Sequence, residues 1–191
     1  MKIGITGGIG SGKSYVCKLL REQGIEVFDC DSAAKKLMLT SADIREKLTD
    51  LIGPGTYDAE GNLNKSMVSQ FLLSSQRNVK AVNEIVHPAV FDEYRSSGLD
   101  YMESAIIFES GAYKLVDKVV CVIAPKETRI NRVMERDHIT REQVLQWMNR
   151  QLNQKEMIRK SDYVIINDGE TDLDKQISKI LTHTSPFTPS D

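Results

Sequence analysis

A glycine-rich segment close to the start of the chain constrains its fold most. Residues 7–14 read Gly-Gly-Ile-Gly-Ser-Gly-Lys-Ser and match the phosphate-binding loop pattern Gly-x-x-x-x-Gly-Lys-Ser/Thr at every position. Glycines let successive backbone N–H groups turn toward phosphate oxygens, and a following helix adds the positive end of its dipole. The alternative is a strand-to-helix turn that binds nothing. The full spacing match, with an apolar run before it and a helical pattern after it, argues against that alternative.

Two residues of this loop have a chemical task if a nucleoside triphosphate binds there. Lys13 is suited to reach the β- and γ-phosphates, and the Ser14 hydroxyl is suited to bind Mg²⁺. We therefore expect a catalytic role for Lys13 and a metal ligand at Ser14. The predicted nucleotide-binding residues in and after the loop are Gly8, Ile9, Gly10, Ser11, Gly12, Lys13, Ser14 and Tyr15.

The composition bounds the class of protein. A chain of 191 residues can hold one sizeable core and a small inserted subdomain. The formal net charge of −2, with charges interspersed, argues against a nucleic-acid-binding surface. No apolar run approaches the roughly 20 residues of a membrane span, and the early loop argues against a signal peptide. Because the cysteines and histidines are scattered, we expect no disulfide framework, no zinc site and a cytoplasmic location.

Five short apolar runs predict the strands of a sheet. Helical patterns separate these runs, and their continuous hydrophobicity is typical of strands that are buried on both faces. We therefore expect an α/β fold of the phosphate-loop (P-loop) NTPase class, with about five parallel strands and helices on both faces. The runs span residues 2–6, 25–29, 104–108, 119–123 and 163–166.

The helical segment after the second predicted strand is longer than a crossover needs. Residues 31–98 contain no convincing strand and predict an inserted domain for a second substrate. Residues 133–155 predict a helical lid, and residues 184–191 a frayed tail. The rest forms the core of a single domain over residues 1–183, made of residues 1–30, 99–132 and 156–183.

Capping patterns and helix breakers predict several helix ends. Gly24 is a natural left-handed stop for the first helix. His87-Pro88 predicts the end of one helix and the start of another. Helix caps are predicted at Thr40-x-x-Asp43, Thr140-x-x-Gln143 and Thr171-x-x-Asp174.

Asp29 and Asp31 stand at the end of the second predicted strand, where open parallel sheets bind ligands. One carboxylate there can orient a hydroxyl and accept its proton, while the other helps to hold water on Mg²⁺. We favour a functional role for Asp31 over the alternative of a helix N-cap. Asp29 stays open between a metal-site role and a structural one.

Arg129, Arg132 and Arg136 fall on one side of a predicted helix, which a second capped helix follows at once. A solvated helix face is the plain alternative. Two helices joined by a short basic turn would, however, serve as a lid over a triphosphate. Arg136 is the preferred candidate to neutralise charge on the transferred phosphoryl group, ahead of Arg132 and Arg141.

Residue types alone leave two further positions open. Glu109 follows the predicted strand of residues 104–108, where it would contact a magnesium-bound water, contact an acceptor, or cap a helix. A lone histidine before a proline, as at His87, is more often structural than functional.

Seven pieces of the sequence together resemble the dephospho-CoA kinase family, over about residues 3–181. The phosphate loop alone is shared by many families, but its combination with Asp-x-Asp and His-Pro is specific. The pieces are the run from Ile5 to Ser14, Asp29-Cys30-Asp31, Asp58-x-x-Gly61-x-Leu63, Asn83-x-Ile85-Val86-His87-Pro88, Ile106-Ile107-Phe108-Glu109, Arg136-Asp137 and the run from Asp162 to Asn167.

The resemblance implies that ATP and Mg²⁺ phosphorylate the ribose 3′-hydroxyl of dephospho-CoA. It implies an adenylate-kinase-like core, with a CoA domain within residues 31–98. Asp31 would be the base, Arg136 the lid arginine, and Asn167 would lie near adenine. The partners would be these two small molecules, for a monomer or weak homo-oligomer. The implied acceptor-binding residues are Asp31, Lys65, His87 and Glu109.

Four residues depart from the family pattern, and none removes a catalytic group. Lys65 keeps a positive charge but loses the bidentate geometry of an arginine. The other departures are Tyr15, Ala105 and Trp147.

Three other functions compete with this reading. A GTP-dependent switch would want Asn-Lys-x-Asp late in the chain, but the only Asn-Lys, at Asn64, is early and lacks the aspartate. A kinase for another small acceptor would share Lys13 and Arg136. A non-catalytic ATP-binding scaffold would need neither an acceptor domain nor a lid.

Overall fold

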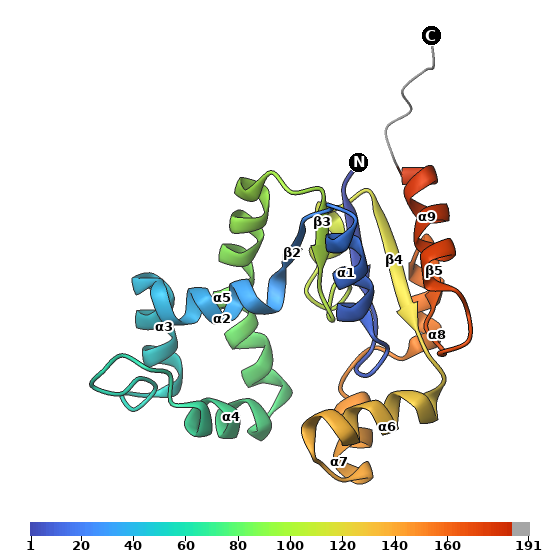
Figure 1. Cartoon of the computed structure of the whole chain (residues 1–191). Helices are drawn as coiled ribbons and strands as arrows, with labels where there is room; N and C mark the ends of the chain where they lie inside the picture. Colours follow the sequence, from blue (N-terminus) through green and yellow to red (C-terminus); the bar gives the residue numbers. More distant parts are fainter. Residues whose placement is uncertain (185–191) are drawn as a thin grey trace. The chain divides into compact units, whose positions relative to one another are not determined.

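Five strands form a sheet in the order β2-β3-β1-β4-β5 (Figure 1). β1 pairs in parallel with β3 and β4, and β4 with β5. The computed structural model describes residues 1–184. The predicted α/β fold with a parallel sheet is confirmed. The strands are β1 (Ile3–Thr6), β2 (Val27–Asp29), β3 (Tyr101–Glu103), β4 (Lys118–Ile123) and β5 (Tyr163–Ile166).

The chain divides into two compact units. The first consists of Met1–Phe28 and Leu99–Asp191, and the second of Asp29–Gly98. The segment predicted as an insertion, residues 31–98, falls within the second unit. Of the predicted tail, Thr184 ends a helix, and residues 185–191 lie outside the described residues.

Helices cover the sheet of the first unit and bury its apolar side chains. Ile5 of β1 and Val122 of β4 are almost fully buried, as is Val16 of the helix after the loop. Each such side chain contributes about 1.5–3 kcal/mol by leaving water. The helices of this unit are α1 (Lys13–Glu22), the short 3-10 helix η1 (Ala112–Leu115), α6 (Lys126–Asp137), α7 (Arg141–Met148), α8 (Gln154–Lys160) and α9 (Leu173–Thr184).

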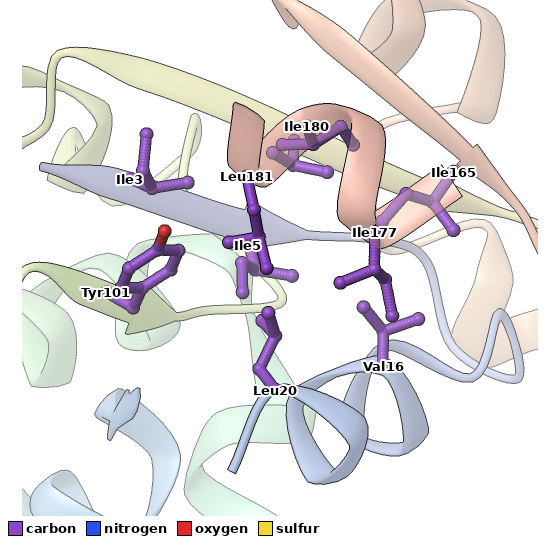
Figure 2. A pocket seen from close by; sticks show the side chains of 10 residues that line it. Ile3, Ile5, Val16, Leu20, Tyr101, Ile165, Ile177, Ile180 and Leu181 are labelled. Atoms are coloured by element: carbon purple, nitrogen blue, oxygen red, sulfur yellow. The ribbon is translucent and has the colours of Figure 1, made fainter. Parts of the chain in front are cut away.

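A small apolar cavity lies where α1 and α9 pack on the sheet (Figure 2). Ile3 and Ile5 of β1 face Leu20 of α1 and Ile177 of α9 around it. Its volume of about 20 Å³ is far below the roughly 300–1,000 Å³ of a ligand pocket, and its lining is apolar. The cavity is therefore a packing gap in the core and is too small for a nucleotide.

The second unit is helical, as expected for residues 31–98. One of its predicted helix breaks is wrong, because α5 runs through Pro88 without interruption. A predicted cap is also misplaced: Ser41, not Thr40, accepts the N–H of Ile44 and begins α3. The helices are α2 (Cys30–Thr40), α3 (Ala42–Ile52), α4 (Lys65–Ser74) and α5 (Gln76–Ser97).

The third strand lies earlier in the chain than predicted. Residues 104–108 contain no strand, since residues 105–109 form a turn and β3 ends at Glu103. The ladder closes where Ser104 N–H donates to the carbonyl of Ile5 at 3.0 Å. The apolar run that follows is buried for another reason, because Ile107 packs against Gly4, where a Cβ would collide with it.

Helix ends in the first unit agree with the sequence in two cases and differ in one. Gly24, with φ of 82°, follows α1 in the left-handed region. Thr140 and Gln143 form the predicted capping box of α7. At α9, however, the cap is Asp172 rather than Thr171, since Asp172 accepts the N–H of Lys175 at 3.0 Å. Among residues 1–184, no helix is both long and apolar enough to cross a membrane.

Candidate active site at the phosphate loop

The phosphate loop, residues 7–14, joins β1 to α1 and turns sharply. Gly10 and Gly12 have φ of 77° and 84°, in the left-handed region that glycine adopts without strain. A Cβ on Gly10 would collide with the backbone carbonyl of Arg129, and one on Gly12 with the side-chain amide of Asn167. Backbone conformation and close packing therefore both require glycine at these two positions.

Lys13 and Ser14 contact the same buried carboxylate. Lys13 Nζ donates to Glu103 Oε1 at 2.5 Å, and the Ser14 hydroxyl donates to the same oxygen at 2.7 Å. Lys13 and Glu103 are buried, whereas Ser14 is exposed. The sheet brings them together, because Glu103 ends β3 beside β1, and Lys13 begins α1 near the end of the loop. The predicted lysine and metal ligand thus share one acidic partner.

The ion pair keeps Glu103 ionised in spite of its burial. Burial alone would raise the pKa of Glu103, but the charge of Lys13 and the hydrogen bonds of the site outweigh it, so the pKa lies below its usual value. Arg21 places a second cation 3.8 Å from Glu103 Oε2. Burial and the nearby charge of Glu103 raise the pKa of Cys17, which therefore stays a thiol. The site therefore presents an ionised carboxylate beside Lys13.

Two arginines and an asparagine support the loop from behind. The buried Arg129 donates from Nε to the carbonyl of Ile9 at 2.9 Å. Arg132 donates to the carbonyl of Asn167 at 3.1 Å, and the side-chain amide of Asn167 donates to the carbonyl of Ser11 at 2.9 Å. Asn167, predicted near adenine, thus contacts the loop backbone. These bonds hold the carbonyls of Ile9 and Ser11 in place.

The remaining predicted arginines are paired with acids. Arg136 is exposed at the end of α6 and makes two hydrogen bonds to Asp137, at 2.8 and 2.7 Å. Arg141 makes a similar pair with Glu127, at 2.7 and 2.8 Å. Of the three candidates, only Arg132 contacts the loop in the described residues, where it also lies 3.5 Å from the carbonyl of Gly10.

We predicted Glu109 at the end of a strand, but it does not lie there. It is exposed in the turn segment after β3, and its Oε1 accepts the N–H of Leu152 at 2.9 Å. The prediction is wrong because the apolar run of residues 104–108 is not a strand. Glu103, directly before that run, is the acid that ends the strand.

The other predicted site residues belong to the second unit. Asp29 caps α2 and accepts the N–H groups of Asp31 and Ser32, both at 3.0 Å. Asp31 lies exposed in the first turn of α2, and Lys65 is exposed at the start of α4. His87 is half-buried on α5, its ring stacks on Phe91 with centroids 5.8 Å apart, and burial lowers its pKa.

Three residues that contact the loop were not predicted as part of the site. Glu103 would have been found as an acid at a strand end if the third strand had been placed correctly. The sequence placed Arg129 on one side of a helix with Arg132 and Arg136, but it gave no indication that Arg129 is buried. Nothing in the sequence pointed to Gln151, whose Oε1 accepts the N–H of Ile9 at 2.8 Å.

The parallel sheet, the phosphate loop after β1 and the Lys13–Glu103–Ser14 cluster define the class as a P-loop kinase fold. A sequence model described as "CoaE: Dephospho-CoA kinase" matches residues 1–172. The chain therefore belongs to the dephospho-CoA kinase family, and the predicted resemblance and the prediction of a kinase are confirmed.

Curated relatives and solved structures agree with this assignment. A dephospho-CoA kinase of Bacteroides fragilis (strain YCH46) is 41% identical over 95% of this chain and 91% of its own length. One of Salinibacter ruber is 37% identical, over 87% and 88%. The crystal structure of TT1252 from Thermus thermophilus has a TM-score of 0.84 at 30% identity, over 97% and 98% of the two chains. A shikimate kinase of Acinetobacter baumannii, with a TM-score of 0.54 at 18% identity over 97% and 95%, shares the fold alone.

Proposed function

We propose that this chain transfers the γ-phosphoryl group of ATP to the ribose 3′-hydroxyl of dephospho-CoA, giving coenzyme A and ADP. The observation that carries the proposal is the Lys13–Glu103–Ser14 cluster, set at a complete phosphate loop in a chain of the dephospho-CoA kinase family. The loop amides and Lys13 bind the phosphates of ATP. Glu103 neutralises Lys13 when no phosphate is bound, so that the buried ammonium group is not left without a counter-ion.

The residues at the loop fit a magnesium ion. Mg²⁺ prefers hard oxygen ligands, and the Ser14 hydroxyl and the ionised Glu103 carboxylate supply two such oxygens, 2.7 Å apart. Ser14 and Glu103 would hold the ion, with Asp29 as a further candidate. When bound, Mg²⁺ neutralises charge on the β- and γ-phosphates. Glu103 is thus the acid of the core that we assign to the metal.

We assign the acceptor to residues of the second unit, with Asp31 as the base that orients the 3′-hydroxyl and accepts its proton. Lys65 and His87 are the proposed acceptor contacts on that unit. A hollow of about 600 Å³ lies between α3 and α5, within the size range of ligand pockets. Its charged lining residues are Asp43, Lys47, Glu84 and Asp92, and Lys47 pairs with Asp43 at 2.7 Å. Because acids outnumber bases in this lining, an uncharged part of the acceptor fits there better than its anionic diphosphate.

Two arginines are candidates to stabilise charge on the transferred group. Arg132 already contacts the loop at the carbonyl of Gly10, whereas Arg136 would first have to leave Asp137. A guanidinium group near the γ-phosphate lowers the barrier by neutralising charge that develops on its oxygens. We keep Arg136 as the predicted lid arginine, with Arg132 as the alternative that needs the smaller movement.

A coupled assay that follows ADP formation tests the proposal. Dephospho-CoA should support ADP formation, whereas adenosine, AMP and shikimate should not. Shikimate is the sharpest control, because shikimate kinases share the fold. Phosphorylation of another acceptor in preference to dephospho-CoA would contradict the proposed substrate. GTP binding that is stronger than ATP binding, without transfer to any acceptor, would contradict the proposed reaction.

A further inference from the structure

A residue far along the chain occupies one backbone donor of the phosphate loop. The Ile9 N–H donates to Gln151 Oε1 at 2.8 Å, although the two residues are 142 positions apart. Backbone N–H groups of such loops are the groups that bind phosphate oxygens. One N–H has a single hydrogen to donate, so Gln151 competes with any phosphate oxygen for this donor.

The carbonyl of Ile9 is connected to the same distant segment through Arg129. It accepts from Arg129 Nε at 2.9 Å, and the guanidinium group of Arg129 also donates to Gln154 Oε1 at 3.1 Å. Between these two glutamines, Leu152 N–H donates to Glu109 at 2.9 Å. Residues 151–154, which we call the latch segment, therefore hold both polar groups of the Ile9 peptide, directly or through Arg129.

The side chain of Ile9 adds a third connection. It packs against a small apolar cluster that α6 and α7 share, formed by Ile130, Val133 and Val144. In Figure 1 the link from α7 to α8, which contains the latch segment, passes beside the loop that leads into α1. Because the interior of such a cluster is close-packed, a shift of Ile9 moves its neighbours on α6 and α7 as well.

We propose that Gln151 is a positioning residue that holds the Ile9 N–H until a phosphate oxygen of the nucleotide displaces it, which releases the latch segment. The proposal rests on ATP binding at this loop, as proposed above. Linkage makes the effect reciprocal: the nucleotide weakens the latch, and the latch weakens nucleotide binding by the same factor. Occupancy of the loop is in this way transmitted to the helices α7 and α8.

Nucleotide affinity tests the competition directly. The probe is Mg²⁺ with the β,γ-imido analogue of ATP, titrated into the wild-type chain and its variants by calorimetry. Gln151→Met keeps the length of the side chain and loses its oxygen acceptor, so it should bind the analogue about two- to ten-fold more tightly. Gln151→Glu keeps an acceptor and adds a negative charge, so it should bind more weakly. Gln146→Ala removes an exposed amide from α7 and is the matched control, with unchanged affinity.

The chain carries its own reporter of the latch. Trp147 is its single tryptophan, lies near the end of α7 shortly before Gln151, and is 39% exposed. The analogue should change the emission of Trp147 in the wild-type chain. In Gln151→Met the emission without nucleotide should already resemble that of the bound state, and the analogue should change it little.

The outcomes separate this inference from the proposed function. Equal or weaker binding by Gln151→Met, with normal binding by the wild-type chain, overturns the latch and leaves the proposed function intact. An unchanged response of Trp147 in that variant also overturns it. Failure of the wild-type chain to bind the analogue overturns both.

Discussion

At the scale of the residue, the alternative to a functional role for Asp31 was that it caps α2. Asp29 provides that cap instead. Asp29 accepts two backbone N–H groups at the start of α2, while Asp31 lies exposed within the first turn. Asp31→Asn should therefore lower turnover by about 10²–10⁴-fold, because the amide cannot accept the proton, with little change in nucleotide affinity. The coupled assay and a nucleotide titration measure the two effects. Asp50→Asn, at an exposed aspartate of α3, is the matched control, and near-normal turnover of Asp31→Asn would contradict its assignment as base.

Gly12 and Gly24 form a natural pair for testing close packing at the loop. Their φ values, 84° and 82°, are almost equal, so alanine costs both positions about 1–2 kcal/mol of backbone strain. A Cβ on Gly12 would also collide with Asn167, whereas nothing lies within 4 Å of one on Gly24. Gly12→Ala should thus lose more stability than Gly24→Ala and should also lose nucleotide binding. Thermal unfolding and nucleotide titration of both variants check this, and equal losses would contradict it.

At the scale of the element, α7 depends on its cap and its neighbours. A helix of eight residues is too short to be stable alone in water. The N–H of Thr140 donates to Gln143 at 2.9 Å, and the N–H of Gln143 donates back to the Thr140 hydroxyl at 3.4 Å. Thr140→Ala should cost about 1 kcal/mol and increase acrylamide quenching of Trp147, while Thr140→Ser keeps the hydroxyl and both properties. Equal quenching in the two variants would show that packing alone holds α7.

Elements were predictable where the local pattern matched the reason for burial. β5 was placed as observed, and β1 and β4 nearly so, because their apolar runs are strands buried in the sheet. The run of residues 104–108 was wrongly predicted as a strand, because Ile107 is buried by a turn that packs on Gly4. The helix break predicted at Pro88 is wrong, because α5 continues through this residue although proline removes a helix hydrogen bond. Apolarity alone does not distinguish a strand from a buried turn.

At the scale of the whole molecule, the candidate site combines a local motif with distant residues. Lys13 and Ser14 were predictable because their roles follow from positions within one loop. Glu103, Arg129 and Gln151 contact the same loop from positions about 90 to 142 residues away. Only the order of strands and helices brings them there, so no local pattern could assign them. Family membership supplied the acceptor, which the loop itself does not specify.

The two units each contain a titratable group that makes stability depend on pH. Burial lowers the pKa of His87 below its usual 6.5, so the unfolded chain takes up this proton first as the pH falls. The Lys13 pair holds the pKa of Glu103 below its usual 4.5, so the unfolded carboxylate is again protonated first. In both cases the unfolded state binds more protons, and the free energy of unfolding decreases as the pH falls.

The two contributions fall in different pH windows and can be separated by substitution. His87→Phe keeps the stacking on Phe91 and removes the titration, so it should flatten the loss of stability that begins near pH 6.5. Glu103→Gln should flatten the loss that begins near pH 4.5. It should also lower stability at neutral pH by about 3–5 kcal/mol, because the buried Lys13 loses its counter-ion. Urea unfolding followed by circular dichroism from pH 3 to pH 8 measures these curves, and an unaltered acid limb in Glu103→Gln would show that the ion pair contributes nothing.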